Sequence, residues 1–176
     1  DLVAAELTDM TATEFSGFRL GASFEPNDTW GLGFSYRSQV EFDAEGDSGG
    51  KVLIDGTTVQ NFTKDEVTIT SALPRQLTLG GHYMFSDAWT GYAEVVWTNY
   101  SEIDKFDFDG NLNLSGSQLP ISDIETKWED QINVRLAADY NTDVAPIRFG
   151  YVYSDEPVPE DYARPTFTPP GTAHTL

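Results

Sequence analysis

The chain has 176 residues, enough for one domain, and its 10 basic and 29 acidic side chains give a formal charge of −19 at pH 7. This acidity excludes a nucleic-acid partner, because phosphates require a basic protein surface. The absence of cysteine excludes disulfides and thiolate metal sites and suits an oxidising envelope compartment. No run of about 18 apolar residues occurs, so a transmembrane helix is also excluded.

Residues 15–25 and 30–42 are predicted to form two strands joined by a short turn near 26–28. Side chains alternate along a strand, and here one face is apolar while the other is small or charged. A long acidic connection near 43–61 follows. The apolar positions of this hairpin are Phe18, Leu20, Ala22, Phe24, Trp30, Leu32, Phe34, Tyr36, Val40 and Phe42.

The same layout is repeated over residues 67–85 and 89–103, which are predicted to form the third and fourth strands. A short turn near 86–88 joins them, and a long connection near 104–123 follows. Pro74 interrupts the third strand. We expect a bulge or kink there, because proline has no N–H to donate to a neighbouring strand.

A third hairpin is predicted at 128–140 and 147–153, with a short turn near 141–146 and a long connection near 155–172. Residues 173–176 resemble the start of a further strand. Because no signal peptide precedes the first strand, we expect the chain to be an internal piece of a longer protein.

Short turns at one end of the strands and long connections at the other are typical of a transmembrane β-barrel. In a soluble sandwich the same alternation would place the apolar face in a core, and this alternative stays open. Glycines on the polar face suit a crowded lumen. Aromatic residues beside the short turns suit an interfacial girdle, namely Phe24, Trp30, Tyr83, Phe85, Trp89 and Tyr140.

Three stretches resemble the FadL/TodX family of Gram-negative outer-membrane transporters for hydrophobic compounds. The first is GFRLGASFEP at 17–26 with LGFSYRS at 32–38, and the second is LPRQLTLGG at 73–81 with Trp89 and WTNY at 97–100. The third is RFGYVYSDEPVP at 148–159, where Glu156 occupies a position at which the family usually has serine.

The resemblance implies an all-β, antiparallel up-and-down transmembrane barrel of about fourteen strands with an N-terminal hatch. This chain would be one partial barrel segment over residues 1–176, contributing about six strands, without the hatch or the lateral opening. The implied function is passive outer-membrane uptake of hydrophobic molecules, above all long-chain fatty acids. The alternatives are an aromatic or alkane hydrocarbon channel of the same family, a non-transport surface barrel, or a soluble all-β adhesion or binding domain.

Charged and aromatic residues on the polar faces are the candidate cargo-binding residues. Arginine suits a carboxylate because its planar fork donates two parallel hydrogen bonds. The alternative is that these side chains pair with one another to fill a polar lumen. The substrate-binding candidates are Arg19, Arg37, Tyr92, Glu94, Arg135 and Arg148, and Glu41, His82 and Asp139 are further charged lumen positions.

Four residues are rim or gating candidates: Asp155, Pro157, Pro159 and Pro74. The segment 155–159 either shapes a ligand entrance or is a rigid loop start, because proline fixes φ and cannot continue the strand pairing. Pro74 either opens a gap between strands or is a tolerated bulge.

No catalytic, metal or cofactor site is predicted. Residues 104–111 resemble a calcium loop, but Lys105 stands where such a loop needs an acidic ligand. Neither His82 nor His174 has a nucleophile at suitable spacing. The expected partners are a hydrophobic small molecule and outer-membrane lipid or lipopolysaccharide, and the parent protein is expected to be a monomer.

Overall fold

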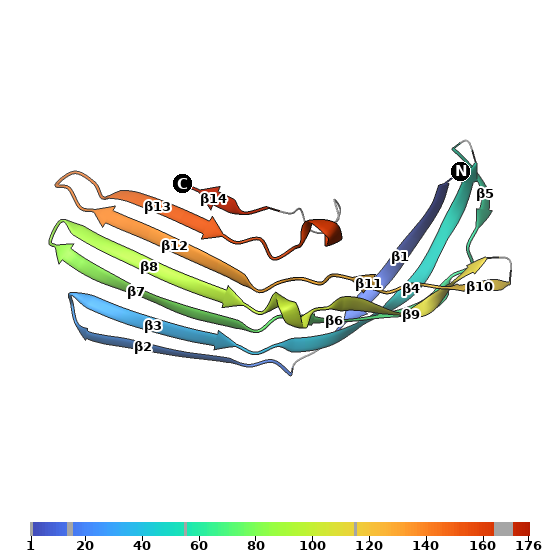
Figure 1. Ribbon diagram of the computed structural model, residues 1–176, viewed down its shortest axis with the longest axis horizontal. Coiled ribbons are helices and arrows are strands. Elements are labelled where there is room, and N and C mark those ends of the chain that lie inside the picture. The colour runs from blue at the N-terminus through green and yellow to red at the C-terminus, as the bar shows by residue number, and fades with distance from the viewer. Residues whose placement is uncertain (1, 14–15, 55, 115, 164–170) are drawn as a thin grey trace. The chain divides into compact units, whose positions relative to one another are not determined.

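The strands of the chain form two antiparallel sheets, shown in the ribbon of the computed structural model in Figure 1. The structure describes residues 2–13, 16–54, 56–114, 116–163 and 171–176. Each sheet belongs to its own compact unit. Unit 1 consists of Asp1–Ser16, Val40–Leu73 and Lys105–Thr126, and unit 2 consists of Gly17–Gln39, Pro74–Asp104 and Lys127–Leu176. Within the described residues, no helix is both long and apolar enough to cross a membrane.

The sheet of unit 2 has the strand order β14-β13-β12-β8-β7-β3-β2, and all pairs are antiparallel. Strands adjacent in the sequence are mostly adjacent in this sheet, as the predicted up-and-down topology requires. Its strands are β2 (Arg19–Asn27), β3 (Trp30–Arg37), β7 (Gln76–Ser86), β8 (Trp89–Thr98), β12 (Gln131–Tyr140), β13 (Ile147–Ser154) and the short β14 (Ala173–Thr175).

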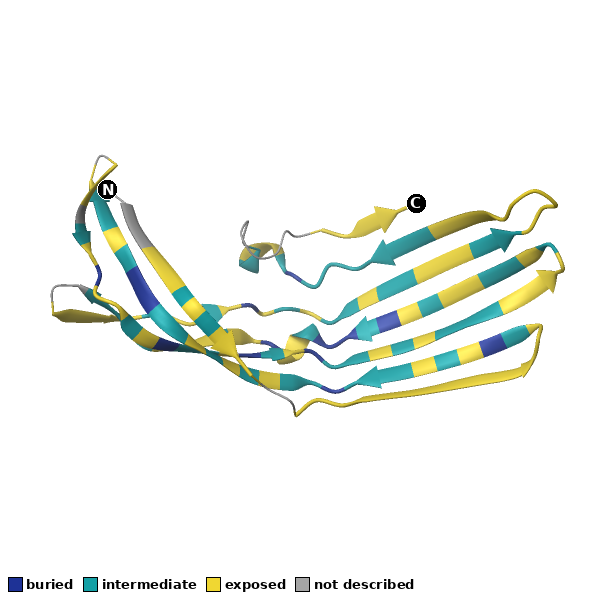
Figure 2. Ribbon diagram, turned by 180° about the vertical axis from the view of Figure 1, so that it is seen from behind, coloured by how far each residue is buried: buried dark blue, intermediate teal, exposed yellow. Residues whose placement is uncertain are grey.

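The pairing register of unit 2 places apolar and polar residues on opposite faces. Because side chains alternate, residues paired across neighbouring strands share a face. One apolar row contains Phe34, Leu79, Val95, Val134 and Tyr153, and one polar row contains Ser23, Gly33, Gly80, Glu94, Arg135 and Val152. The alternation is visible as bands of exposed and less exposed residues along the strands in Figure 2.

The first short turn lies one residue later than the sequence predicts. Asn27 still belongs to β2, and the turn is at Asp28 and Thr29. The Asn27 side-chain oxygen accepts hydrogen bonds from the backbone N–H groups of Thr29 and Trp30, at 2.9 and 3.3 Å, which moves the reversal toward Trp30. The predicted strand start at Phe15 lies outside the described residues.

The long predicted strands are interrupted where their backbone groups find other partners. The second breaks after Arg37, where the N–H of Ser38 donates to the carbonyl of Phe18. The third breaks at Pro74, in agreement with the expected kink. The fourth ends at Thr98 and continues as a 3-10 turn, Tyr100–Glu102.

The sheet of unit 1 corrects the prediction of long loops near 43–61 and 104–123, because most of the described residues of both stretches lie in strands. Its main order is β1-β4-β6-β9-β10, with β5 paired to β4 and β11 to β9. Strand β4 is polar and glycine-rich, but β1 and β6 pair with it on its two sides and supply its hydrogen bonds. The strands are β1 (Leu2–Ala12), β4 (Val40–Ile54), β5 (Thr57–Asn61), β6 (Asp65–Leu73), β9 (Lys105–Leu114), β10 (Ser117–Pro120) and β11 (Ile124–Glu125).

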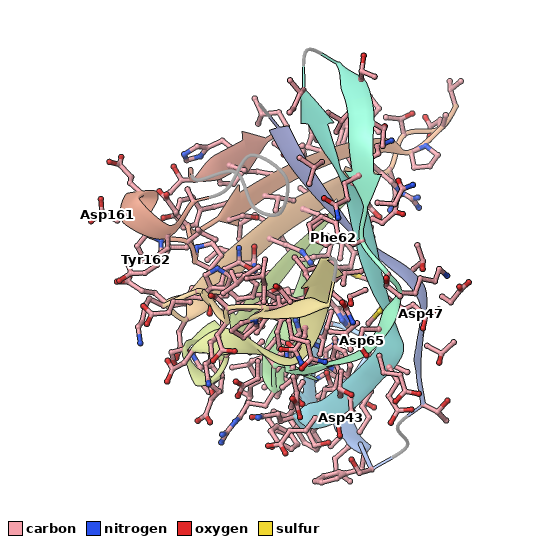
Figure 3. The ribbon with its side chains drawn as sticks, turned by 90° about the vertical axis from the view of Figure 1, so that its right-hand side faces the viewer. Asp43, Asp47, Phe62, Asp65, Asp161 and Tyr162 are labelled. Atoms are coloured by element: carbon pink, nitrogen blue, oxygen red, sulfur yellow. The ribbon has the colours of Figure 1, made fainter. Side chains whose placement is uncertain are left out.

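Unit 1 has a small core and an acidic surface. Phe62, Val67 and Ser48 are buried, and the Ser48 hydroxyl donates to the backbone oxygens of Asn111 at 2.7 Å and Asp65 at 3.2 Å. Figure 3 labels Phe62 together with Asp43, Asp47 and Asp65 of β4 and β6. The third long connection, near 155–172, contains a 3-10 turn at Glu160–Tyr162, and residues 164–170 lie outside the described part.

Candidate functional site

The polar face of unit 2 carries an open groove of about 680 Å³. This volume is in the range of small-molecule sites, which is about 300–1,000 Å³. Strands β2, β3, β7, β8, β12 and β13 all contribute to it. Tyr92, Glu94 and Arg135, three of the predicted cargo-binding residues, line this groove together with Ser23, Glu25, Gly31, Gly33, Thr78, Gly80, His82, Ala137, Gly150 and Val152.

Glu94 and Arg135 form an ion pair inside this groove. They are opposite one another in the register of β8 and β12, and an Arg135 Nη1 donor lies 2.6 Å from Glu94 Oε1. The Cβ and Cγ of Glu94 lie 3.4 Å from the place a Cβ on Gly80 would occupy, so the glycine leaves room for the glutamate stem. The two charges neutralise each other, as the lumen-filling alternative expects.

A second network connects Tyr92, Asp139 and Arg148. Asp139 and Arg148 are paired in the register of β12 and β13, with Arg148 Nε 3.3 Å from Asp139 Oδ1. The Tyr92 hydroxyl donates to the other oxygen of Asp139 at 3.3 Å. Three predicted lumen residues from three strands are therefore brought together, and the Asp139 carboxylate has a partner on each oxygen.

Arg19 and Arg37 face each other on the same polar face. They are directly opposite in the register of β2 and β3, as their positions in one hairpin suggest. Arg37 donates to the backbone oxygen of Pro74 at 3.2 Å, and Pro74 itself is buried. Neither arginine forms an ion pair with a carboxylate in the part of the chain that the structure describes, whereas Arg135 and Arg148 both do.

The predicted rim segment is fastened to the start of β12. The N–H of Asp155 donates to Ile132 O, the Gln131 side chain donates to Asp155 O at 2.9 Å, and the N–H of Glu129 donates to Pro157 O at 2.7 Å. Pro159 leads into the Glu160–Tyr162 turn, and Val158 between the two prolines is only 2% exposed. These contacts hold the segment 155–159 in place, as expected for a rigid loop start.

A carboxylate that the sequence did not single out organises the ends of β8 and β12. Asp130 accepts hydrogen bonds from the Trp97 indole at 3.0 Å and the Asn99 side chain at 2.8 Å. It also accepts from the Ser101 hydroxyl at 2.6 Å and the Ser101 N–H at 3.2 Å. Burial raises the pKa of Asp130, but the donors from Ser101, Asn99 and Trp97 outweigh it and lower the pKa below 3.8.

His82 and Glu41, two further predicted lumen charges, belong to different units. His82 lies in the groove, where its ring and the Glu25 side chain both cover Gly31, each 2.7 Å from the place a Cβ there would occupy. Glu41 belongs to β4, which is a strand of unit 1. The second predicted strand breaks before Glu41, and the pairing of Glu41 with the arginines of unit 2 stays a prediction.

The apolar face of unit 2 is not covered by other described residues. Phe24, Leu79 and Phe149 are 60%, 55% and 56% exposed. Aromatic rings gather at the short-turn ends of the strands. The ring pairs are Trp89 with Tyr140 at 4.5 Å, Tyr83 with Phe85 at 5.1 Å, Phe24 with Trp30 at 5.8 Å and Trp89 with Phe149 at 6.5 Å between centroids.

The acidic side chains of unit 1 are partly neutralised by lysines. Lys105 contacts Asp107 at 2.6 Å and Asp123 at 2.8 Å, and Lys64 contacts Asp47 at 3.2 Å. Hydrogen bonds from Lys105 lower the pKa of Asp123, and those to Asp107 and Asp123 raise the pKa of Lys105. Across the described ranges, no group of three or more His, Cys, Asp or Glu side chains is arranged to hold a metal ion.

Residues 3–170 match the family model described as outer membrane protein transport protein (OMPP1/FadL/TodX). The chain belongs to this family. A putative outer membrane protein of Neisseria meningitidis serogroup B is 23% identical over 154 residues, which cover 81% of this chain and 33% of that protein. The family and this relative place the chain in a β-barrel of the bacterial outer membrane.

Solved structures of FadL/TodX type share the fold. A Pseudomonas aeruginosa FadL homologue matches with a TM-score of 0.62 and 20% identity, over 81% of this chain and 34% of its own. The Pseudomonas putida toluene transporter TodX matches with a TM-score of 0.56 and 18% identity, over 79% of this chain and 34% of its own. The CymD monoaromatic hydrocarbon channel matches with a TM-score of 0.55 and 18% identity, over 79% of this chain and 37% of its own. The chain therefore spans about one third of the proteins that it matches.

Membership of the FadL/TodX family assigns the two faces of unit 2. In an outer-membrane barrel the apolar face meets lipid and the polar face meets the lumen. The exposed apolar residues and the ring pairs at the short turns then form the lipid-facing band and its girdle. The alternative of a soluble domain required these faces to pack against one another, and the described residues leave them exposed.

Proposed function

We propose that the protein containing this chain is a passive, non-enzymatic outer-membrane channel for hydrophobic small molecules, and that its cargo is a long-chain fatty acid. The observation that supports this cargo is the pair Arg19 and Arg37, opposite one another on the lumen face. Like charges directly opposite across two strands are destabilising. A bound carboxylate would relieve this repulsion and accept hydrogen bonds from both guanidinium groups.

The other arginines of the lumen face have a different role in this proposal. Arg135 and Arg148 already pair with Glu94 and Asp139, so a cargo carboxylate would have to compete with a bonded carboxylate at either place. At Arg19 and Arg37 it would not compete with any carboxylate that the structure describes. We therefore place the headgroup at the first hairpin, and Tyr92, Glu94, Arg135 and Arg148 along the path of the apolar chain.

The rim residues complete the path. Asp155, Pro157 and Pro159 form a fixed border of the entrance, because the segment is tied to Glu129 and Gln131. Pro74 fixes Arg37 through its backbone oxygen rather than opening a gap. Outside the barrel, the lipid-facing band contacts outer-membrane lipid or lipopolysaccharide, and the protein acts as a monomer.

A hydrocarbon cargo is the second candidate, since two of the similar folds are named as a toluene transporter and a monoaromatic hydrocarbon channel. Calorimetric titration of oleate and, separately, toluene into the detergent-purified full-length protein distinguishes the two. We expect oleate binding to weaken by about 1.5–3 kcal/mol in the Arg37→Ala variant, the range for a hydrogen bond to a charged group.

The matched control is Arg75→Ala, which removes an arginine that already pairs with a carboxylate, Glu102, at 2.8 Å. It should leave oleate binding unchanged. Toluene binding that is unaffected by Arg37→Ala, without oleate binding, would make the protein a hydrocarbon channel. Binding of neither ligand would favour a surface barrel that acts in adhesion.

A further inference from the structure

Three glycines on the lumen face of unit 2 have no structural reason within the described chain. A Cβ added at Gly150 would meet no atom within 4 Å, one at Gly33 only a backbone oxygen at 4.0 Å, and one at Gly21 only a backbone oxygen at 3.5 Å. None of them is among the described glycines with positive φ. Glycine inside a strand costs roughly 0.5–1 kcal/mol relative to alanine, so this bare backbone is kept against a stability cost.

Other glycines of the same sheet differ, because a neighbour fills the space of their missing Cβ. Phe85 occupies that space at Gly91, with a ring carbon at 2.7 Å, and Leu32 and a backbone oxygen occupy it at Gly81. Glycine in a strand often marks a bulge, a tight bend, or the close approach of another backbone or a ligand. Gly33 and Gly150 pair in registers without a shift and have no close neighbour in the space of a Cβ, which favours a ligand at both positions.

Gly33 and Gly150 both line the groove of about 680 Å³, from β3 and β13, and Gly21 does not. The groove wall between them combines small residues such as Gly80 and Ala137 with polar groups that are bonded to one another. Glu94 is held by Arg135, and the Tyr92 hydroxyl by Asp139. An apolar molecule can lie against this wall without leaving a charge or a hydroxyl without a partner.

We propose that the bare backbone at Gly33 and Gly150 is a cargo-contact surface that sets the width of the groove. An extended or flat apolar molecule lies against the two glycines, and its size limit is fixed by their missing side chains. This inference rests on the proposed function and adds the residues that determine which molecules fit. It holds for the apolar body of the cargo, whether or not that cargo carries a carboxylate.

The test uses Gly33→Val and Gly150→Val in the detergent-purified full-length protein, with oleate and toluene titrated by calorimetry. Valine suits a strand, and its Cβ would meet no atom closer than 4.0 Å at either site, so folding should be kept. We expect the Kd of the ligand that the unmodified protein binds to rise about tenfold or more, because one methylene in an apolar site changes binding by about 10–200-fold. Ala145→Val, in an exposed turn that does not line the groove, is the control and should change the Kd less than about twofold.

The outcomes separate this inference from the proposed function. If the unmodified protein binds neither ligand, the proposed function and the inference are both wrong. If it binds and all three valine variants bind equally well, only the inference is wrong. If Gly33→Val and Gly150→Val lower the unfolding temperature without changing the Kd, a protein segment occupies the groove and the inference is again wrong.

A second measurement avoids the variants, in case one of them does not fold. A photoreactive diazirine fatty acid is cross-linked to the unmodified protein, and the labelled peptides are identified by mass spectrometry. Labelling of the β3 and β13 peptides that contain Gly33 and Gly150 would support the inference. Labelling confined to other peptides would overturn it.

Discussion

The two units of the chain are both antiparallel sheets, yet they differ in what they expose. Unit 1 has fifteen acidic and three basic residues, and unit 2 has fourteen and seven. Among the described residues, four large apolar side chains are exposed in unit 1 and nineteen in unit 2. The unit 2 pattern suits lipid on the apolar face, and the unit 1 pattern suits water. Alternation thus predicts a strand, and the composition of the exposed face indicates the solvent.

The largest effect should come from placing a charge on the two kinds of exposed surface. Leu79 of β7 and Leu7 of β1 are both exposed leucines, at 55% and 40%. We expect Leu79→Arg to lower the free energy of unfolding by about 2–4 kcal/mol, the cost of arginine at the bilayer midplane. Leu7→Arg should change it by less than about 0.5 kcal/mol, as at an ordinary surface site.

The measurement is urea unfolding of the full-length protein in lipid vesicles, followed by tryptophan fluorescence. Equal losses in the two variants would contradict the assignment of lipid to unit 2 and water to unit 1. Leu79→Phe is the control for the loss of the leucine side chain, because it keeps an apolar group toward lipid.

Within unit 2, Asp130→Ala should have the next largest effect. The substitution leaves the Trp97 indole without its acceptor and removes one of the two acceptors of the Asn99 side chain, which keeps only the Ser101 hydroxyl, and Asn99 is only 6% exposed. We expect a loss of about 2–3 kcal/mol, because hydrogen bonds to a charged group contribute about 1.5–3 kcal/mol. Asp143→Ala, in an exposed turn, is the control and should be nearly neutral. The same urea titration measures both, and a neutral Asp130→Ala would mean that water replaces the carboxylate.

The strands of unit 2 were predictable because apolar residues occupy every second position in nearly all of them. In the sheet of unit 1, only residues 40–42 and 67–73 were predicted as strand. The middle of strand β4, from Asp43 to Gly50, is mostly polar and glycine residues, and it is extended because β1 and β6 pair with its two edges. Such pairing depends on residues far away in the sequence, and the local pattern of β4 carries no sign of it.

The sequence predicted which side chains of the candidate site lie on the lumen face, but it did not predict which of them contact one another. Alternation placed Glu94 and Arg135 on the lumen side, but their contact needs the register of β8 against β12, which joins residues 41 positions apart. Asp130 was missed for the same reason, because its partners Trp97, Asn99 and Ser101 are 29 to 33 positions away. The glycines on the polar face were visible in the sequence, but only the structure separates Gly33 and Gly150 from glycines with a packing role.

A smaller effect is expected for the ion pair of the groove. Glu94 and Arg135 are 36% and 55% exposed at their side chains, so solvent screens their attraction. A double-mutant cycle with Glu94→Gln and Arg135→Gln should give a coupling free energy of about 0.2–1 kcal/mol in the urea assay. A coupling well above this range would indicate that the full barrel removes water from the pair. A Kd for oleate that falls in Glu94→Gln would indicate that Arg135 then binds the headgroup.

The smallest effect should be local and should depend on pH. It concerns two carboxylates whose pKa is lowered, Asp123 in unit 1 and Asp130 in unit 2. Asp123 accepts from Lys105 and, through its other oxygen, from the N–H of Phe108 at 3.1 Å. A lowered pKa in the folded state means that the stabilisation is present above the ordinary value of 3.8 and is lost as the pH falls through the folded value. Acidification below about 3.8 should therefore lower the protection factor of the Phe108 amide, which compares its exchange rate with that of the unfolded chain at the same pH. Asp123→Asn should abolish this pH dependence.

Salt separates the two carboxylates. The main donor to Asp123 is the exposed Lys105 ammonium, and an attraction between exposed charges is screened at high ionic strength. Asp130 has only uncharged donors among its described partners, and these hydrogen bonds depend little on ionic strength. Exchange at the Phe108 amide should therefore become faster at neutral pH when salt is added, while exchange at the Ser101 amide should not. An equal response at both amides, measured by NMR in detergent micelles, would mean that unit 1 and unit 2 hold their loop carboxylates by the same kind of interaction.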